Sequence, residues 1–112
     1  MRDSRNWLLT IAADQLGDAQ SGTMADPSAA AIGAAYGALL SALSNIERAR
    51  IVDHPNVWAA ELGAQRVGLA DDVREEVLAL IRDYYKPARV DSARAIYVAY
   101  AIVDMARRHA GM

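Results

Sequence analysis

The sequence predicts an all-α fold, a compact five-helix bundle-like domain with one long central helix at about residues 27–50. Apolar residues recur at helical spacing along most of the chain, and no segment alternates apolar and polar residues as a strand would. Capping residues and prolines divide the apolar stretches from one another. The 112 residues are enough for one hydrophobic core, so we expect a single domain over residues 1–112.

The first helix is predicted at about residues 4–19, with Asp3 or Ser4 as its N-cap. Its apolar residues share one stripe and should lie on the core: Leu8, Leu9, Ile11, Ala12 and Leu16. Residues 20–25 are polar and include a glycine, which predicts a loop.

The long helix follows from an uncharged run at residues 27–46, with Asp26 as N-cap and Pro27 at the first helical position. Small residues recur along it at every fourth position: Ala29, Gly33, Gly37 and Ser41. We expect this row to allow close packing against the last helix, so that bulk at Gly37 would force the two helices apart.

The same uncharged run is long enough to cross a bilayer. However, it consists mainly of alanine, glycine and serine, which gain little from hydrocarbon. We therefore expect no membrane span. The first twenty residues lack the basic and apolar segments of a signal peptide, so the expected location is cytoplasmic.

Two shorter helices should follow. One is predicted at about residues 56–67 and ends at Gly68, a left-handed cap. The next begins at Asp71 and Asp72, with Glu75 placed as in a capping box, and ends before Pro87.

The last helix is predicted at about residues 92–109, with Asp91 as its N-cap. Residues 95–103 carry no charge, so this helix is either central in the fold or has an exposed flank that another protein covers. Asp104 is expected to pair with Arg108 or Arg107. Tyrosines lie on this helix and at the end of the preceding one, and we expect them to bind a partner: Tyr84, Tyr85, Tyr97 and Tyr100.

The composition excludes several kinds of chemistry. The chain has no cysteine, hence no disulfide and no thiolate nucleophile or metal ligand. Its net charge of −2 does not favour DNA as a partner. The sequence contains no Glu-x-x-His motif and no glycine-rich phosphate loop, so we expect neither a metal site nor a cofactor.

One pair of residues resembles a catalytic signature. Arg48 precedes His54 with five residues between them, which is similar to the Arg-x(4–6)-His signature of the HEPN helical ribonucleases. The resemblance covers seven residues, and Ala49 replaces the polar residue that usually follows the arginine of the family. It implies that Arg48 binds the scissile phosphate and that His54 moves a proton, without a metal.

The leading functional prediction is a small non-catalytic protein-binding or regulatory module that occupies the surface of another protein. Size and composition lead us to expect a bacterial, phage or mobile-element origin. One alternative is a HEPN-like ribonuclease, or an inactive relative, that uses Arg48 and His54; RNA is a partner only in that case. Another is a structural homo-oligomer assembled through the last helix.

Overall fold

The computed structural model describes residues 4–22, 25–84, 86 and 90–111. The regular elements of this part are all helices, and the all-α, bundle-like fold expected from the sequence is confirmed. They are α1 (Ser4–Ser21), α2 (Pro27–Leu40), α3 (Asn45–Ala49), α4 (Val57–Val67), α5 (Asp71–Arg82) and α6 (Ser92–His109).

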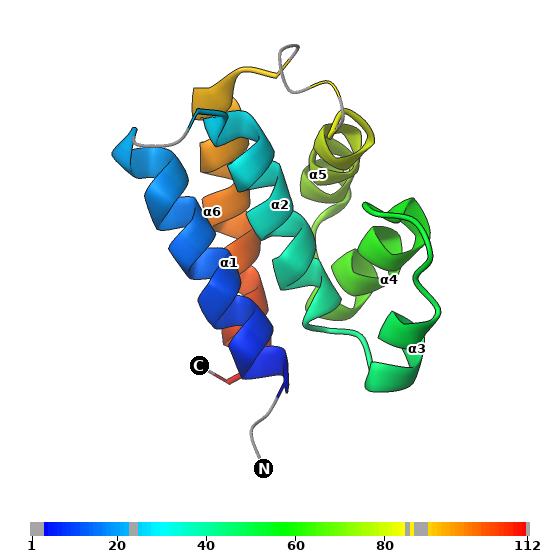
Figure 1. Cartoon of the computed structure of the whole chain (residues 1–112). Coiled ribbons are helices and arrows are strands. Elements are labelled where there is room, and N and C mark those ends of the chain that lie inside the picture. Colours follow the sequence, from blue (N-terminus) through cyan, green and yellow to red (C-terminus); the bar gives the residue numbers. More distant parts are fainter. Residues whose placement is uncertain (1–3, 23–24, 85, 87–89, 112) are drawn as a thin grey trace.

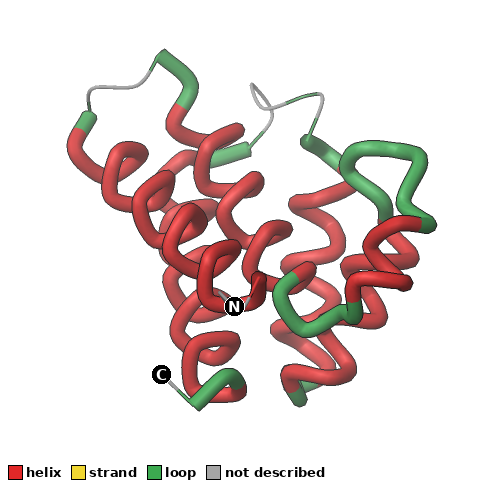
Figure 2. The backbone as a smooth tube through the Cα atoms, turned by 60° about the horizontal axis from the view of Figure 1, so that its bottom comes forward, coloured by secondary structure: helices red, strands yellow, loops and turns green. Residues whose placement is uncertain are grey.

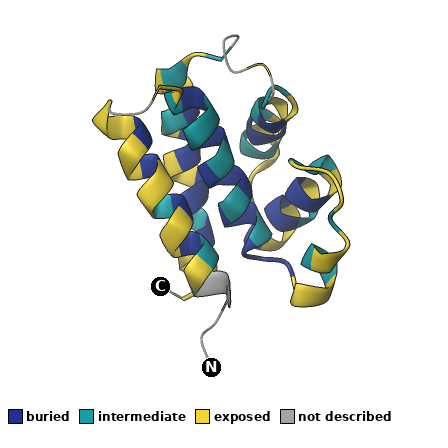
Figure 3. Ribbon diagram, viewed as in Figure 1, coloured by how far each residue is buried: buried dark blue, intermediate teal, exposed yellow. Residues whose placement is uncertain are grey.

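Helix α2 is the centre of the arrangement (Figure 1). It contacts α1 and α6 on one side, and α4 and α5 on the other. The short helix α3 lies at the edge of the molecule, beside α4 (Figures 1 and 2). All the helices except α3 carry buried residues on their inward sides, and α1 shows a row of exposed residues on its outward side (Figure 3). Helix α6 also has exposed residues opposite its buried ones.

The core is filled by small and branched side chains from five of the helices. Its largest fully buried members are Leu9, Leu16, Ile32, Tyr36, Leu39, Val77, Ile81 and Ile102. Alanines fill much of the space between them, and Ala31, Ala34 and Ala38 of α2 are completely inaccessible to solvent. Helices with such small side chains pack with their axes close together, which explains how α2 fits among four neighbours.

The expected long helix at residues 27–50 is wrong, because the chain forms two helices there. After Leu40, the amides of Ala42 and Leu43 bond to carbonyls three residues earlier, so the last turn tightens. Ser44 then takes an extended conformation with φ −71° and ψ 164°, and α3 starts anew. The chain therefore has six helices in its described residues instead of five.

A capping box accounts for the new start. The Ser44 hydroxyl accepts a hydrogen bond from the Glu47 amide at 3.1 Å, and a Glu47 carboxylate oxygen accepts one from the Ser44 amide at 2.8 Å. These bonds satisfy two amides that a helix start would leave unpaired. The Arg48 guanidinium donates to the carbonyls of Leu40 and Leu43 at 3.1 and 2.6 Å, which closes the end of α2.

The expected close packing through the row of Ala29, Gly33, Gly37 and Ser41 is also wrong at its two glycines. Added Cβ atoms at Gly33 and Gly37 would meet no atom within 4 Å. Ala29, Gly33 and Gly37 are half-buried, and only Ser41 is buried. This row lies on the least buried side of α2, whereas Ala31, Ala34, Ala35 and Ala38 face the core.

The close approach is made by a different glycine. At Gly63 of α4, an added Cβ would lie 2.3 Å from the carbonyl oxygen of Leu39 on α2. One turn further along α4, Arg66 forms an ion pair with Glu47 and donates a hydrogen bond to the Ala42 carbonyl at 3.4 Å. The backbone contact and the ion pair together fix α4 against the end of α2.

The remaining helices match their expected bounds closely. Gly68 caps α4 in the left-handed region, with φ 82°, as the sequence predicts. Asp91 caps α6, where its carboxylate accepts a hydrogen bond from the Ala93 amide at 3.1 Å. The capping box expected at Asp72 and Glu75 does not form, because α5 begins two residues earlier than that box requires and its N-cap is Ala70.

Candidate functional site on the outer face of helix α6

Helix α6 is held by its inward side and leaves its opposite side exposed. The inward residues are buried against the core: Ala95, Val98, Ala99, Ile102, Val103 and Ala106. We call the opposite side the outer α6 face; its residues are Arg94, Tyr97, Tyr100, Ala101, Asp104 and Arg108, all exposed. Because the inward side is fixed by packing, these side chains are presented on a rigid element.

Tyr97 is the most exposed aromatic residue of this face, with 68% of its surface accessible. The Arg94 guanidinium lies over its ring, 5.3 Å from the centroid. Arg94 also forms an ion pair with Glu76 of α5. The cation–π contact and the ion pair hold Arg94 at the border between α5 and the outer α6 face.

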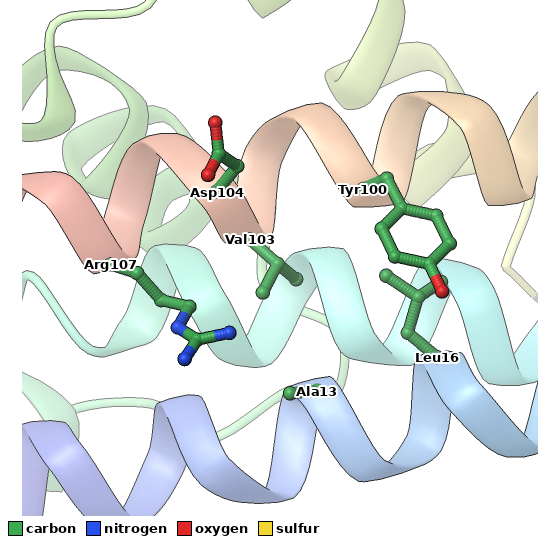
Figure 4. A pocket seen from close by; sticks show the side chains of 6 residues that line it. All are labelled: Ala13, Leu16, Tyr100, Val103, Asp104 and Arg107. Atoms are coloured by element: carbon green, nitrogen blue, oxygen red, sulfur yellow. The ribbon is translucent and has the colours of Figure 1, made fainter. Parts of the chain in front are cut away.

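Tyr100 lies beside a small pocket between α6 and α1. The pocket has a volume of about 120 Å³ and is lined by Ala13, Leu16, Tyr100, Val103, Asp104 and Arg107. Figure 4 shows Tyr100, Val103 and Arg107 pointing from α6 toward α1, whereas Asp104 points away from α1. The Tyr100 hydroxyl donates a hydrogen bond to the side-chain carbonyl of Gln20, which ties this tyrosine to α1.

A second, shallower hollow lies on the outer α6 face itself. It has a volume of about 400 Å³ and is lined by Tyr97, Tyr100, Ala101 and Asp104. Ala101 is the smallest of these four side chains, a single methyl group. At its end, Asp104 forms an ion pair with Arg108 at 3.0 Å, the pairing expected from their spacing.

Tyr84, another tyrosine of the expected partner-binding set, does not join this face in the structure. Tyr84 is half-buried and packs on the core, and its ring contacts His54 edge-on at 5.6 Å between centroids. Tyr85 lies outside the described residues. The described part of the tyrosine set is therefore divided between a packing role at the end of α5 and an exposed role on α6.

His54 lies between two tyrosine rings. Its other contact is with Tyr36 of α2, edge-on, with 5.3 Å between the ring centroids. The Tyr36 hydroxyl accepts a hydrogen bond from the Asn56 amide at 2.9 Å. Burial raises the pKa of Tyr36 above its ordinary value, and the hydrogen bond from Asn56 opposes that rise.

Arg48 and His54, the pair suggested by the ribonuclease resemblance, have separate sets of partners. Arg48 donates to the carbonyls of Leu40 and Leu43 and to the side chain of Asn45, so its guanidinium closes the end of α2. His54 packs between Tyr36 and Tyr84. These contacts give both residues structural roles that do not depend on catalysis.

Two other features are absent from the described residues. No three histidine, aspartate or glutamate side chains of this part lie together in a way that could hold a metal ion. Among the helices described, none is long and apolar enough to cross a membrane.

Sequence reasoning identified Tyr97, Tyr100 and the Asp104–Arg108 pair but missed Arg94. The available signal was spacing: Arg94, Tyr97, Ala101 and Asp104 are separated by three, four and three residues, which places them on one helix face. Comparisons with protein-family models, with curated proteins and with solved structures each found no match.

Proposed function

We propose that this chain is a non-catalytic protein-binding module whose contact surface is the outer α6 face. The observation that carries the proposal is the pair of exposed tyrosines, Tyr97 and Tyr100, which both line a shallow, open hollow on this face. Tyrosine is enriched at protein interfaces, where its ring supplies apolar area and its hydroxyl retains a polar partner.

The setting of these tyrosines supports the same function. They lie on a helix whose inward side chains are packed in the core. Binding would therefore reduce the conformational entropy of the backbone very little. Charged side chains border the apolar centre at Arg94, Asp104 and Arg108. An apolar centre with a polar rim is the usual organisation of an interface.

Site-specific photo-cross-linking tests the proposal. A photoreactive phenylalanine analogue replaces Tyr97 in one variant and Trp58, an exposed aromatic of α4, in the matched control. Each variant is irradiated in a lysate of the source cells and as purified protein. We expect cross-linked protein from position 97 and much less from position 58. Equal yields at both positions, or none at position 97, would contradict the proposed surface.

A further inference from the structure

The outer α6 face is arranged symmetrically about the level of Ala99. Arg94 and Asp104 lie five residues before and after Ala99, and their charges have opposite signs. Tyr97 and Ala101 lie two residues before and after it, and the side chain of Tyr97 is large whereas that of Ala101 is small. Reversing the direction of the helix therefore exchanges each of these four residues with its complement.

We propose that the occupant of this face is a second copy of the chain, with the two α6 helices antiparallel about a two-fold axis level with Ala99. This inference rests on the proposed function, because it names the partner of the same surface. In such a pair, residues equally far from the axis in opposite directions meet, and each contact occurs twice.

The apolar contact of the pair is formed by Tyr97 and Ala101. The spacing of Arg94, Tyr97, Ala101 and Asp104, by three, four and three residues, is that of a seam between two packed helices. Each Tyr97 ring would enter the hollow over Ala101 of the other copy. That hollow is open to solvent in the single chain. The Tyr97 side chain is free to enter it on another copy, because 68% of the Tyr97 surface is exposed.

The charged contact lies at both ends of the seam. Each Arg94 would meet Asp104 of the other copy while it keeps its own partner, Glu76. Asp104 likewise keeps Arg108, 3.0 Å away. A guanidinium has five donors and a carboxylate about four acceptor positions, so both can serve two partners. The result is a row of alternating charges that continues from one copy into the other.

This complementarity favours a second copy over an unrelated protein. A different partner would require no relation between the two halves of α6, whereas a two-fold contact requires each half to complement the other. Helix α6, with 18 residues, is about 27 Å long. A contact along one helix of that length lies at the small end of specific interfaces, so we expect a dimer that dissociates on dilution.

Exchange of charges tests the pairing in the purified full chain. Arg94→Asp alone places two carboxylates opposite each other, and Asp104→Arg alone places two guanidinium groups opposite each other. We expect each single variant to raise the dissociation constant of the dimer at least about tenfold, measured by sedimentation equilibrium. An equal mixture of the two variants should restore dimers, because both contacts then join opposite charges.

The mixture also distinguishes a contact between two copies from the loss of ion pairs within one chain. Loss of the Glu76 or Arg108 ion pair is the same in each variant alone and in the mixture, so only a contact between copies explains recovery. Circular dichroism verifies that both variants keep their helical content. A wild-type chain that stays monomeric at all concentrations, or a mixture no more dimeric than its components, would overturn the inference. Position-97 cross-links to a different protein would then leave the proposed function standing.

A second measurement tests the register without changing any charge. The chain has no cysteine of its own, so an introduced thiol has no competitor. A mixture of Tyr97→Cys and Ala101→Cys variants should form an intermolecular disulfide faster than either variant alone, because these positions face each other in the antiparallel pair. Equal rates in all three samples would contradict this arrangement.

Discussion

Helix α2 carries two glycines on its half-buried side, and α4 carries one glycine where it meets α2; only the glycine of α4 lies where backbones touch. Space is open around Gly33 and Gly37, whereas Gly63 stands against the Leu39 carbonyl. Four alanines of α2 therefore fill the core, Ala31, Ala34, Ala35 and Ala38, whereas its two glycines do not. A small residue permits a close approach, but the position of the neighbouring helix determines where one occurs.

Substitution of Gly63 should destabilise the fold strongly. The Cβ added by Gly63→Ala would lie 2.3 Å from a backbone oxygen, which cannot rotate away as a side chain would. We expect the free energy of unfolding to fall by about 2 kcal/mol or more, despite the higher helix propensity of alanine. The shift of the urea midpoint measures this. An unchanged midpoint would mean that α4 does not approach α2 as closely as the structure shows.

Loss of the cap on α3 should have a smaller effect on the same contact. Ser44→Ala removes the acceptor of the Glu47 amide, and Glu47 is the residue that pairs with Arg66 of α4. We expect a loss of about 1 kcal/mol in the free energy of unfolding, which is typical for an N-cap. Ser44→Asp, which retains an acceptor, is the control and should stay closer to wild type.

The start of α3 could have been predicted, whereas the contact at Gly63 could not. Ser44 and Glu47 have the spacing of a capping box, but the uncharged run across residues 27–46 suggested a continuous helix. The Gly68 cap and the bounds of α6 followed from local signals and are confirmed. Gly63 has no local signal, because its contact depends on where the chain places Leu39, 24 residues earlier.

The candidate site was predictable to a similar extent. Tyr97 and Tyr100 followed from their place on an uncharged stretch, and the structure shows both exposed. Tyr84 lacks that signal, because it follows Arg82 and Asp83, and it packs against the core. The spacing of Arg48 from His54 resembles a catalytic pair, yet the Arg48 guanidinium donates hydrogen bonds to carbonyls at the end of α2.

The ion pair that joins α3 to α4 should make this contact sensitive to acid. Bonds from the Arg66 guanidinium, and then from the Ser44 amide, lower the pKa of Glu47 from 4.5 to about 2. Because the folded-state pKa is depressed, the stabilisation is present above the ordinary pKa of 4.5 and is lost as the pH falls toward about 2.

Urea midpoints of wild type and Glu47→Gln across this range measure that loss. We expect wild type to be more stable than Glu47→Gln at neutral pH, and the difference to shrink steadily as the pH falls below about 4.5. The other carboxylates titrate in both proteins and cancel in the comparison. A difference that does not change with pH would mean that Glu47 does not hold α3 to α4 through its charge.

Substitution of a glycine on the half-buried side of α2 should change stability only slightly, and in the opposite direction. Gly37→Ala makes the same chemical change as Gly63→Ala, but its Cβ would meet no atom within 4 Å. Alanine is favoured over glycine inside a helix, so we expect the free energy of unfolding to rise by about 0.5–1 kcal/mol, with Gly33→Ala as a replicate. A higher urea midpoint for both α2 variants, beside a lower one for Gly63→Ala, would show that neighbouring backbone, not residue type, determines the cost. A lower midpoint for Gly37→Ala would instead mean that the outer side of α2 is closely packed, as the spacing of its small residues first suggested.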